Sequence, residues 1–343
     1  MGVLSALGTV YLSVGIVGPR VRPRPPLPRL GLSRGSNNVL SPRPSARHVD
    51  TKDHLRAYWR LTKPRIWGLL VFTGAIAMLV AYKATPGASL TAGLFLSGVV
   101  ALVLGSASAE VLTNYHDRDI DGMMKRTMNR ELPAGKIRPR SALVFGLVMA
   151  VLSVLVPFLL INAISAGFML LGLVDNIVVY SLLLKRRSWL SIILGGISGG
   201  MPVLVGYTAV SGAVTPLALY MSALVIVWIP THIWSLAIFN RNDYEAAKVP
   251  MLPVVFGDRV ASICIAGTSA LLTVFSVAIF LFTPSVSIFY TATAVVLGGV
   301  VLVYSGRLAL NQSRKTAWTL FKLTSPYLTI IFLVLGVTFW LAA

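Results

Sequence analysis

The sequence has 343 residues, of which 56% are hydrophobic and only 12% are charged. A soluble domain has about 25% charged residues, so this composition excludes a soluble, disordered or fibrous protein and predicts an all-α polytopic membrane protein. The single cysteine, Cys264, excludes an internal disulfide and a cysteine-based metal site. The net charge of +19 suggests nucleic-acid binding at first sight. Its placement along the chain indicates membrane topology instead, and no nucleic-acid partner is expected.

Apolar stretches alternate with polar loops along the chain, and each stretch is close to the ~20 residues that a helix needs to cross a bilayer. Every Lys and Arg except Lys83 falls in the N-terminal segment or in every second loop. Positive charge marks the cytoplasmic side, so we expect the N-terminus inside, the C-terminus outside, and nine transmembrane helices around a central cavity. The expected spans are 66–82, 90–113, 140–161, 165–184, 190–209, 216–239, 260–281, 285–305 and 324–342.

Residues 1–54 form a separate region that is rich in Arg and Pro, and its first 49 residues contain no acid. Such a composition cannot build a packed core, so the segment is expected to be a disordered basic extension before a membrane domain at 55–343. Three interpretations stay open: an extension produced by an upstream start in a prokaryotic protein, a mitochondrial transit peptide, or a lipid-facing basic arm. The first places the protein in a prokaryotic plasma membrane and the second in the mitochondrial inner membrane.

The second span leads into an acidic segment that starts near Asn114. If the helix continues beyond the membrane, Asn114, Asp117 and Asp121 lie on one face, with Glu110 one turn deeper. Two carboxylates one turn apart can bind Mg²⁺ together with phosphate oxygens. The neighbouring cations can neutralise the same phosphates. A solvated charge run is the simpler alternative. The acids stand at the end of a span in a chain that otherwise avoids acids, which favours the metal–phosphate interpretation.

A second polar loop follows the sixth expected span and repeats part of the first. Asn240 and Asp243 have the same spacing as Asn114 and Asp117, and both loops follow an even-numbered span on the basic side. This indicates two related halves whose acidic loops face one cavity.

Two further polar features lie between and beside these loops. Lys185 and Arg186 close the fourth span; they are topology anchors, and a phosphate contact is the functional alternative. His232, near the end of the sixth span, either faces the cavity as a ligand or acid–base group or only donates a hydrogen bond to a neighbouring helix. Asp175 stands in the middle of a span, where an ionisable group is costly and indicates a cavity.

Several of these motifs occur together in one known family. They lie at 61–65, 117–135, 184–187, 228–234 and 243–253. Through them the segment 55–343 resembles the protoheme IX farnesyltransferases, also called heme O synthases, in the UbiA superfamily of intramembrane prenyltransferases. Two departures stand out. The residue four before Asp117 is Thr113 where the superfamily usually has Asn, and the second Asp-x-x-x-Asp motif falls on Asn240 and Tyr244, which leaves Asp243 as the acid of that loop.

The resemblance implies that farnesyl diphosphate and heme b are the substrates and that heme O is the product. It implies Mg²⁺ held by Asp117, Asp121 and Asp243, an enzyme embedded in the lipid bilayer, and hand-over of the product to heme A synthase or to terminal oxidase assembly. His232 or His116 would be the heme-iron ligand. The residues implied to contact substrate or its diphosphate are Lys63, Asn114, Lys125, Arg126, Arg130, Lys185, Arg186, His232, Asn240, Asp243 and Tyr244.

Two other classes of function remain as alternatives. A UbiA-type prenyltransferase with a quinone-precursor or lipid acceptor needs the same acids and cations. A membrane transporter or heme-binding module needs a cavity but not two acidic–basic loops at one face, and transporters usually show broken spans in corresponding halves. A CDP-alcohol phosphatidyltransferase shares part of the first motif but fails at Arg118, Lys125 and Pro139.

Overall fold

The computed structural model describes residues 51–281 and 288–341, which form helices and no strand. In chain order these are α2 Thr51–Leu61, α3 Pro64–Ala84, α4 Ala92–Met123, α5 Pro139–Leu160, α6 Ala163–Val174, the π-helix η1 Asp175–Leu184, α7 Ser191–Leu194, α8 Ile197–Ser211, α9 Pro216–Phe239, α10 Arg241–Ala246, α11 Leu252–Val277, the 3₁₀-helix η2 Ala278–Leu281, α12 Ile288–Asn311 and α13 Arg314–Leu341.

Within these described ranges nine helical segments are long and apolar enough to cross a membrane, which confirms the all-α polytopic fold. Residues 1–50, most of the expected basic extension, lie outside the described residues, but helix α2 already begins at Thr51. Two spans start earlier than expected. Helix α11 begins at Leu252 and bends at Gly257, whose φ is 82°, and α13 begins at Arg314. Charged side chains interrupt the apolar pattern near both starts: Asp258 and Arg259 follow the bend of α11, and Arg314 and Lys315 form the first turn of α13.

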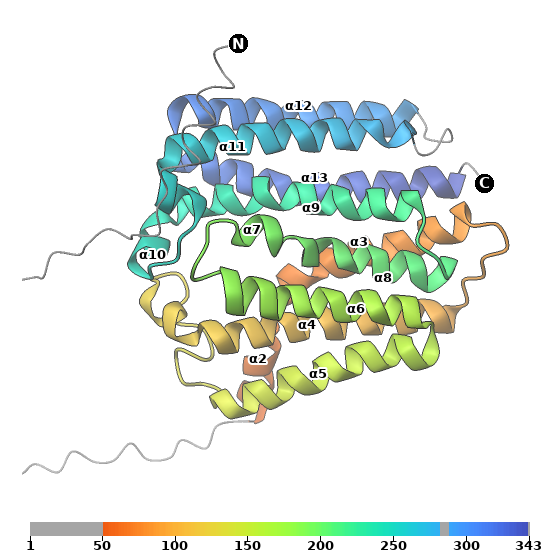
Figure 1. The fold of residues 1–343 in the computed structure, drawn as a ribbon, viewed down its shortest axis with the longest axis horizontal. Helices are drawn as coiled ribbons and strands as arrows, with labels where there is room; N and C mark the ends of the chain where they lie inside the picture. Colours follow the sequence, from red (N-terminus) through yellow and green to blue (C-terminus); the bar gives the residue numbers. More distant parts are fainter. Residues whose placement is uncertain (1–50, 282–287, 342–343) are drawn as a thin grey trace, which may run out of the picture. The chain divides into compact units, whose positions relative to one another are not determined.

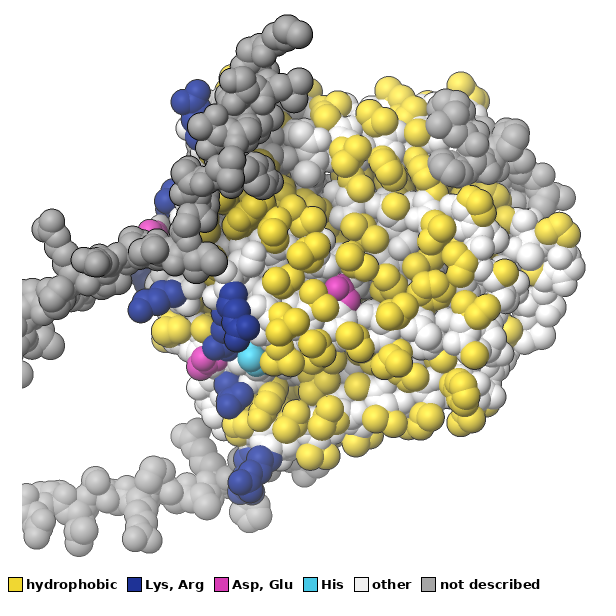
Figure 2. All heavy atoms as spheres, in the orientation of Figure 1, with side chains coloured by type: hydrophobic (Ala, Val, Ile, Leu, Met, Phe, Trp, Pro, Cys, Tyr) yellow, Lys and Arg dark blue, Asp and Glu magenta, His cyan; other side chains and the backbone are white. Residues whose placement is uncertain are grey.

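The long helices run side by side, and the loops that contain the acidic and basic motifs lie at one end of the bundle (Figure 1). Lys and Arg side chains gather at this same end, whereas the visible side of the bundle is largely apolar (Figure 2). The end of α13 and the α3–α4 loop lie at the opposite end (Figure 1). Every second loop of the chain therefore meets at one polar surface, as the charge pattern predicts.

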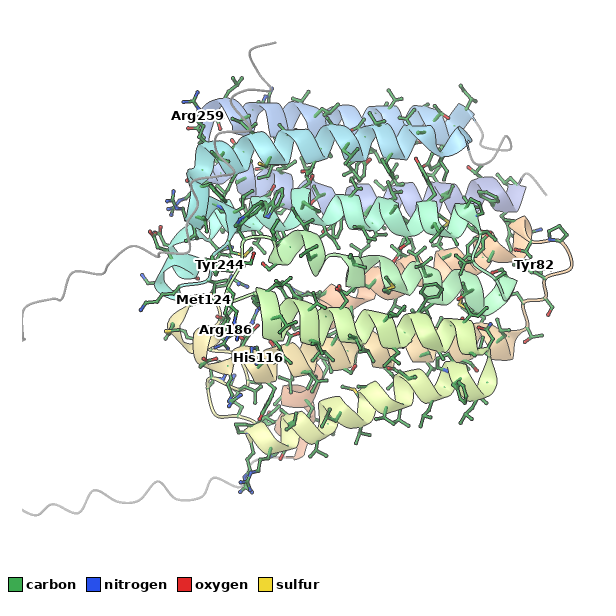
Figure 3. The ribbon with its side chains drawn as sticks, in the orientation of Figure 1. Tyr82, His116, Met124, Arg186, Tyr244 and Arg259 are labelled. Carbon is green, nitrogen blue, oxygen red and sulfur yellow. The ribbon has the colours of Figure 1, made fainter. Side chains whose placement is uncertain are left out.

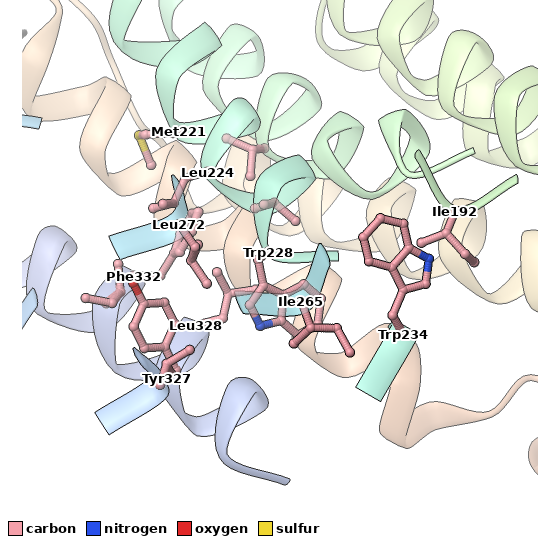
Figure 4. Packing of buried hydrophobic residues seen from close by; sticks show 14 of the residues in the cluster. Ile192, Met221, Leu224, Trp228, Trp234, Ile265, Leu272, Tyr327, Leu328 and Phe332 are labelled. Carbon is pink, nitrogen blue, oxygen red and sulfur yellow. The ribbon is translucent and has the colours of Figure 1, made fainter. Parts of the chain in front are cut away.

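The core contains large side chains from α9, α11 and α13. Trp228 packs beside Ile265 and Leu328 in this cluster (Figure 4). The indole Nε1–H of Trp228 donates to the carbonyl of Thr324 at 2.7 Å, so the one polar group of this side chain is satisfied. Elsewhere small residues allow close contact, because helices in lipid associate through packing rather than through the hydrophobic effect. A Cβ added to Gly206 of α8 would lie 2.1 Å from the backbone oxygen of Gly74 in α3.

Two spans are irregular in the middle of the bundle. The fourth passes from α6 into the π-helix η1, and the fifth is broken between α7 and α8. Asp175, which the sequence analysis placed at a cavity, lies at this irregular point. Its Oδ2 accepts a hydrogen bond from the backbone N–H of Ser198 in the first turn of α8, at 2.7 Å. An acid at this end complements the dipole of the helix, which gives Asp175 a structural role.

The orientation of the bundle in the membrane is a testable prediction. Gly122 is exposed at the end of α4, and a Cβ there meets no atom within 4 Å. In a Cys264→Ala background, we expect Gly122→Cys to react with an impermeant maleimide only from the inner side of oriented vesicles. Ser89→Cys, in the exposed loop at the other end, is the matched control and should react only from outside. The opposite labelling pattern would invert the topology.

Candidate active site

Helix α4 continues as a regular helix to Met123, so the polar face predicted from the spacing is present. Asn114, Asp117 and Asp121 are 5%, 2% and 3% exposed, which makes them buried polar residues near the C-terminal end of a candidate membrane span. Burying an ionised carboxylate is costly unless it is paired or hydrogen-bonded. The neighbouring segments must therefore supply positive charge.

Each buried aspartate has its own cation. The Lys185 ammonium forms a salt bridge with Asp117 Oδ2, and the Arg130 guanidinium donates to Asp121 Oδ2 at 2.7 Å. Arg186 is a more distant partner of Asp117, at 3.8 Å. Lys185 and Arg186 come from the turn after η1, whereas Arg130 comes from the loop after α4. The cations that the sequence analysis considered as topology anchors therefore also neutralise the acids.

Lys185 is held in a closed environment. Its Nζ lies 5.2 Å from the centre of the Tyr180 ring, in addition to its salt bridge with Asp117. Burial alone would lower the pKa of Lys185, but the electrostatic effects of Tyr180 and Asp117 outweigh it and the pKa is raised. The ammonium therefore stays protonated at physiological pH.

Arg186 forms hydrogen bonds with the more exposed side of α4. It donates two hydrogen bonds to the Asp119 carboxylate, at 2.7 and 2.6 Å, and one to the backbone oxygen of His116 at 2.7 Å. Its hydrogen bond to Asp119 is the main reason that the pKa of Arg186 is raised. Figure 3 shows Arg186 and His116 together at the polar end of the bundle. Arg186 therefore holds the turn after η1 against α4, which keeps Lys185 in place.

A third cation lies one turn deeper. Lys63 connects α2 to α3 with a positive φ of 52°, a backbone conformation that is unusual for a side-chain-bearing residue. Its Nζ lies 2.7 Å from Glu110 Oε2, on the same face of α4 as Asn114. Burial is the main reason that the pKa of Lys63 is lowered, although Glu110 opposes this effect.

Lys63, Asn114, Asp121 and Arg130 border a pocket of about 180 Å³ between α2, α4 and the loop that follows α4. We call it the polar pocket. Arg60 and Glu131 also line it, and the sequence analysis did not select either residue. Arg60 comes from the amphipathic helix that precedes the first span, where nothing in the local pattern distinguishes it from other interfacial cations. The residues that line the polar pocket are Arg60, Leu61, Lys63, Asn114, Asp121, Arg130, Glu131, Leu132 and Pro133.

The second polar loop meets the first, as the repeat predicts. Asp243 Oδ2 accepts a hydrogen bond from the backbone N–H of Arg126 at 3.1 Å, and the two labelled residues Met124 and Tyr244 lie at the same end of the bundle (Figure 3). Tyr244 is buried. Asn240 hydrogen-bonds its own helix at the carbonyl of Leu236, 3.1 Å away.

Two predicted catalytic cations take a different position from the rest. Lys125 and Arg126 have exposed side chains at the start of the loop after α4. In the described part of the chain neither side chain has a carboxylate partner within 4 Å, whereas Lys63, Arg130 and Lys185 do. Their charge therefore remains available at the mouth of the site.

His232 lies in an aromatic stack rather than among the acids. Its ring is stacked between Trp228 and Phe321, with centroid distances of 4.4 and 4.3 Å. Its Nδ1 forms a 2.7 Å hydrogen bond with the hydroxyl of Thr324. The structure thus places His232 against α13 and does not bring it to the polar pocket.

A large apolar groove of about 580 Å³ lies between α4, α5, α6 and η1. His116 lines it, and its Nε2 is buried without a hydrogen-bond partner. At 100° per residue His116 projects from nearly the opposite side of α4 to Asn114 and Asp121. The groove is therefore separate from the polar pocket.

Comparison with known proteins gives the class of this site. The model of the UbiA prenyltransferase family matches residues 70–341. A protein called protoheme IX farnesyltransferase in Thermoplasma volcanium is 41% identical, over 82% of this chain and 96% of that protein. One of the same name in Desulforudis audaxviator is 44% identical, over 84% of this chain and 90% of that protein.

Solved structures agree on the fold. A UbiA homolog from Archaeoglobus fulgidus, bound to GPP and Mg²⁺, has a TM-score of 0.60 at 20% identity and covers 81% of this chain and 98% of its own. A structure described for digeranylgeranylglyceryl phosphate synthase has a TM-score of 0.68 at 16% identity and covers 84% and 99%. These likenesses define the chain as an intramembrane prenyltransferase, an enzyme. It belongs to the UbiA prenyltransferase family and, within it, to the protoheme IX farnesyltransferases.

The acidic face has donors that fit a magnesium ion. Asn114 Oδ1 and Asp117 Oδ1 are buried oxygens without a hydrogen-bond partner, and Mg²⁺ prefers such oxygen ligands. No cluster of three or more His, Cys, Asp or Glu in residues 51–281 and 288–341 is arranged to hold a metal ion, so the structure does not bring Asp117, Asp121 and Asp243 together as three ligands of one ion. Mg²⁺ is usually bound by one or two carboxylates together with substrate phosphates, and the two aspartates of α4 fit that arrangement.

The Lys185–Asp117 pair gives a stability prediction in the absence of divalent metal. Removing one partner of a buried ion pair leaves an uncompensated charge and costs about 3–5 kcal/mol. We therefore expect Lys185→Ala to lower the unfolding midpoint in detergent with EDTA. The double variant Lys185→Ala/Asp117→Asn should recover part of the loss, because it leaves no unpaired charge. Arg187→Ala, at an exposed neighbouring position, is the control. If Lys185→Ala and Arg187→Ala lower the unfolding midpoint equally, the Lys185–Asp117 pair has no specific effect on stability.

Proposed function

We propose that this protein transfers the farnesyl group of farnesyl diphosphate to a vinyl group of heme b, and that addition of water then gives heme O. The observation that carries the proposal is the acidic face of α4 with its three inner cations, Lys63, Arg130 and Lys185. A diphosphate is a poor leaving group until its charge is neutralised, and this arrangement concentrates cations and metal-binding oxygens at one place.

Magnesium would be held by Asp117 and Asp121 on α4, with Asn114 beside them and Asp243 from the second loop. The ion would neutralise the diphosphate and so make it a better leaving group. Asp243 is already tied to the first loop through Arg126 N–H, which supports a role for both loops in one site. Asp117 and Asp121 each accept their shortest salt bridge through Oδ2, from Lys185 and Arg130.

The cations bind the diphosphate and hold its charge in the transition state. Lys63 and Arg130 line the polar pocket, and Lys185 is next to it on Asp117. When the substrate and metal bind, these cations exchange a carboxylate for a phosphate oxygen, so their charge stays compensated. Lys125 and Arg126, exposed at the mouth, would close over the outer phosphate oxygens. Tyr244 and Asn240 belong to the loop that covers this mouth.

Ionisation of the diphosphate would leave an allylic cation inside the bundle. The carbon–oxygen bond breaks with its electron pair going to the diphosphate, and the heme vinyl group attacks the cation through its terminal carbon. The apolar helices exclude water from the farnesyl chain. Both substrates are largely apolar, so a site between apolar helices with a polar end suits them. The archaeal and bacterial relatives support a prokaryotic plasma membrane, and the product would pass to heme A synthase or to terminal oxidase assembly.

Product analysis tests this function directly. Purified protein in lipid vesicles is mixed with heme b, farnesyl diphosphate and Mg²⁺, and the heme product is weighed by mass spectrometry. We expect the hydroxyethylfarnesyl adduct from wild type and none after chelation of Mg²⁺. If adducts form only with a quinone precursor or a lipid alcohol, that molecule and not heme is the acceptor. Movement of substrate across the vesicle membrane without prenyl transfer would indicate a transporter.

Substitution of the two buried aspartates of α4 tests metal binding in the same assay. Asp117→Asn and Asp121→Asn keep the size of each side chain and remove its charge. We expect a loss of turnover of at least about 10²-fold, the scale found when one electrostatic group of an active site is removed. Asp53→Asn, in an exposed part of α2, is the control. Full activity in either α4 variant would remove that aspartate from metal binding.

Variants of two cations after α4 can distinguish a diphosphate contact from a topology anchor. Arg130 contacts Asp121 in the polar pocket, whereas Arg140 is exposed at the start of α5. A charge-assisted hydrogen bond contributes about 1.5–3 kcal/mol, so Arg130→Ala should reduce kcat/KM for farnesyl diphosphate by roughly 10- to 150-fold. Arg140→Ala should have little effect. Equal behaviour of the two variants would mean that the loop acts only as an anchor.

A further inference from the structure

A second cavity is connected to the polar pocket by an ion pair, because Lys63 of the polar pocket contacts Glu110 of this cavity. It is a cavity of about 80 Å³ between α3, α4, α6 and α8, which we call the internal cavity. Its lining is largely apolar, but Glu110, Asn176 and Ser198 contribute polar side chains. A cavity of this size with several polar partners can hold ordered water, since one water needs only about 10–15 Å³.

Glu110 lies where the internal cavity and the polar pocket adjoin. Its side chain is 22% exposed, and Oε2 accepts a hydrogen bond from Lys63 Nζ at 2.7 Å. Lys63 lines the polar pocket, and Glu110 lines the internal cavity. On α4, Glu110 is four residues from Asn114, about 6 Å deeper along the helix axis. A carboxylate therefore stands just below the expected position of the diphosphate.

The proposed reaction needs a group at this position. After the vinyl group bonds to the farnesyl carbon, the positive charge lies on the other vinyl carbon, next to the porphyrin. Water then adds, and the reaction as a whole releases one proton. A base that takes this proton must lie close to the carbon that carried the diphosphate, because the new cation is only two bonds away from it.

We propose that Glu110 is the general base that takes the proton from this water. The step rests on the function proposed above. The water oxygen forms a bond to the vinyl carbon through a lone pair, one O–H bond breaks, and its proton goes to the Glu110 carboxylate. No oxidant or reductant is required. The proton then leaves past Lys63 toward the polar pocket and the inner aqueous side.

Other acids of the site do not meet this requirement. Among the described residues that line the internal cavity, Glu110 is the only carboxylate. Asp117 and Asp121 do not line the internal cavity, and the proposed function assigns both to the metal. Asp175 accepts the backbone N–H of Ser198 instead.

Glu110→Gln tests the proposal through the identity of the product. Removing a general base typically costs about 10²–10⁴-fold in rate, so we expect kcat to fall within this range while the KM for farnesyl diphosphate is unchanged. With no base for the water, the cation should instead lose a proton from carbon, and the adduct that forms should be lighter by one water molecule. In oxygen-labelled water, only the wild-type product should carry the label. Glu245→Gln, an exposed carboxylate in the second loop, is the matched control.

Glu110→Gln also removes the partner of the buried Lys63, so a loss of fold must be distinguished from a loss of the base. Glu110→Asp keeps the charge next to Lys63 but withdraws the carboxylate by one methylene, and it should also release unhydrated adduct. The proposal is overturned if either variant folds, binds farnesyl diphosphate normally and makes labelled heme O at the wild-type rate. If wild type itself makes no heme adduct, the proposed function fails and not the assignment of the base alone.

Discussion

The need to neutralise two buried aspartates near the C-terminal end of α4 constrains the rest of the site. The side chains of Asp117 and Asp121 are only 3% and 5% exposed, and an unpaired charge there would cost several kcal/mol. Both aspartates pair with cations from outside α4, because Lys185 and Arg130 come from two other segments. The turn after η1 and the loop after α4 must therefore fold back onto this helix.

This constraint brings together the resting structure and the proposed chemistry. A diphosphate needs the same cations that the aspartates need, and a metal needs the same carboxylates. The acids and cations are thus already paired in this structure, and in the proposed reaction binding would exchange one set of charge contacts for another. Arg186, held by Asp119 and the carbonyl of His116, keeps Lys185 near the exchange point and so limits the reorganisation that catalysis would require.

Local patterns predicted the architecture well because hydropathy and helical spacing are local properties. The nine spans and the common face of Asn114, Asp117 and Asp121 follow from them. Contacts between residues on different helices do not follow from local patterns. Arg60 reaches the polar pocket from an ordinary amphipathic helix, and only the packing of α13 against α9 shows that the His232 ring is enclosed by Phe321. The early starts of α11 and α13 escaped prediction because helices continue through the charged interface, where hydropathy falls.

Helix α4 also orders the chemistry by depth. It is 32 residues long, well beyond the ~20 needed to cross the apolar layer, and the additional turns carry the aspartates to the aqueous end. From Asp121 to Glu110 the same face descends about 16 Å, from a pocket rich in cations to a small, largely apolar cavity. Ionisation of the diphosphate would occur at the upper level and capture of the cation at the lower one. In this structure Lys63 pairs with Glu110 between the two levels. In the proposed reaction Lys63 would turn to the diphosphate and leave the Glu110 carboxylate free to take the proton. The same helix face would then promote first ionisation and afterwards capture of the cation by water.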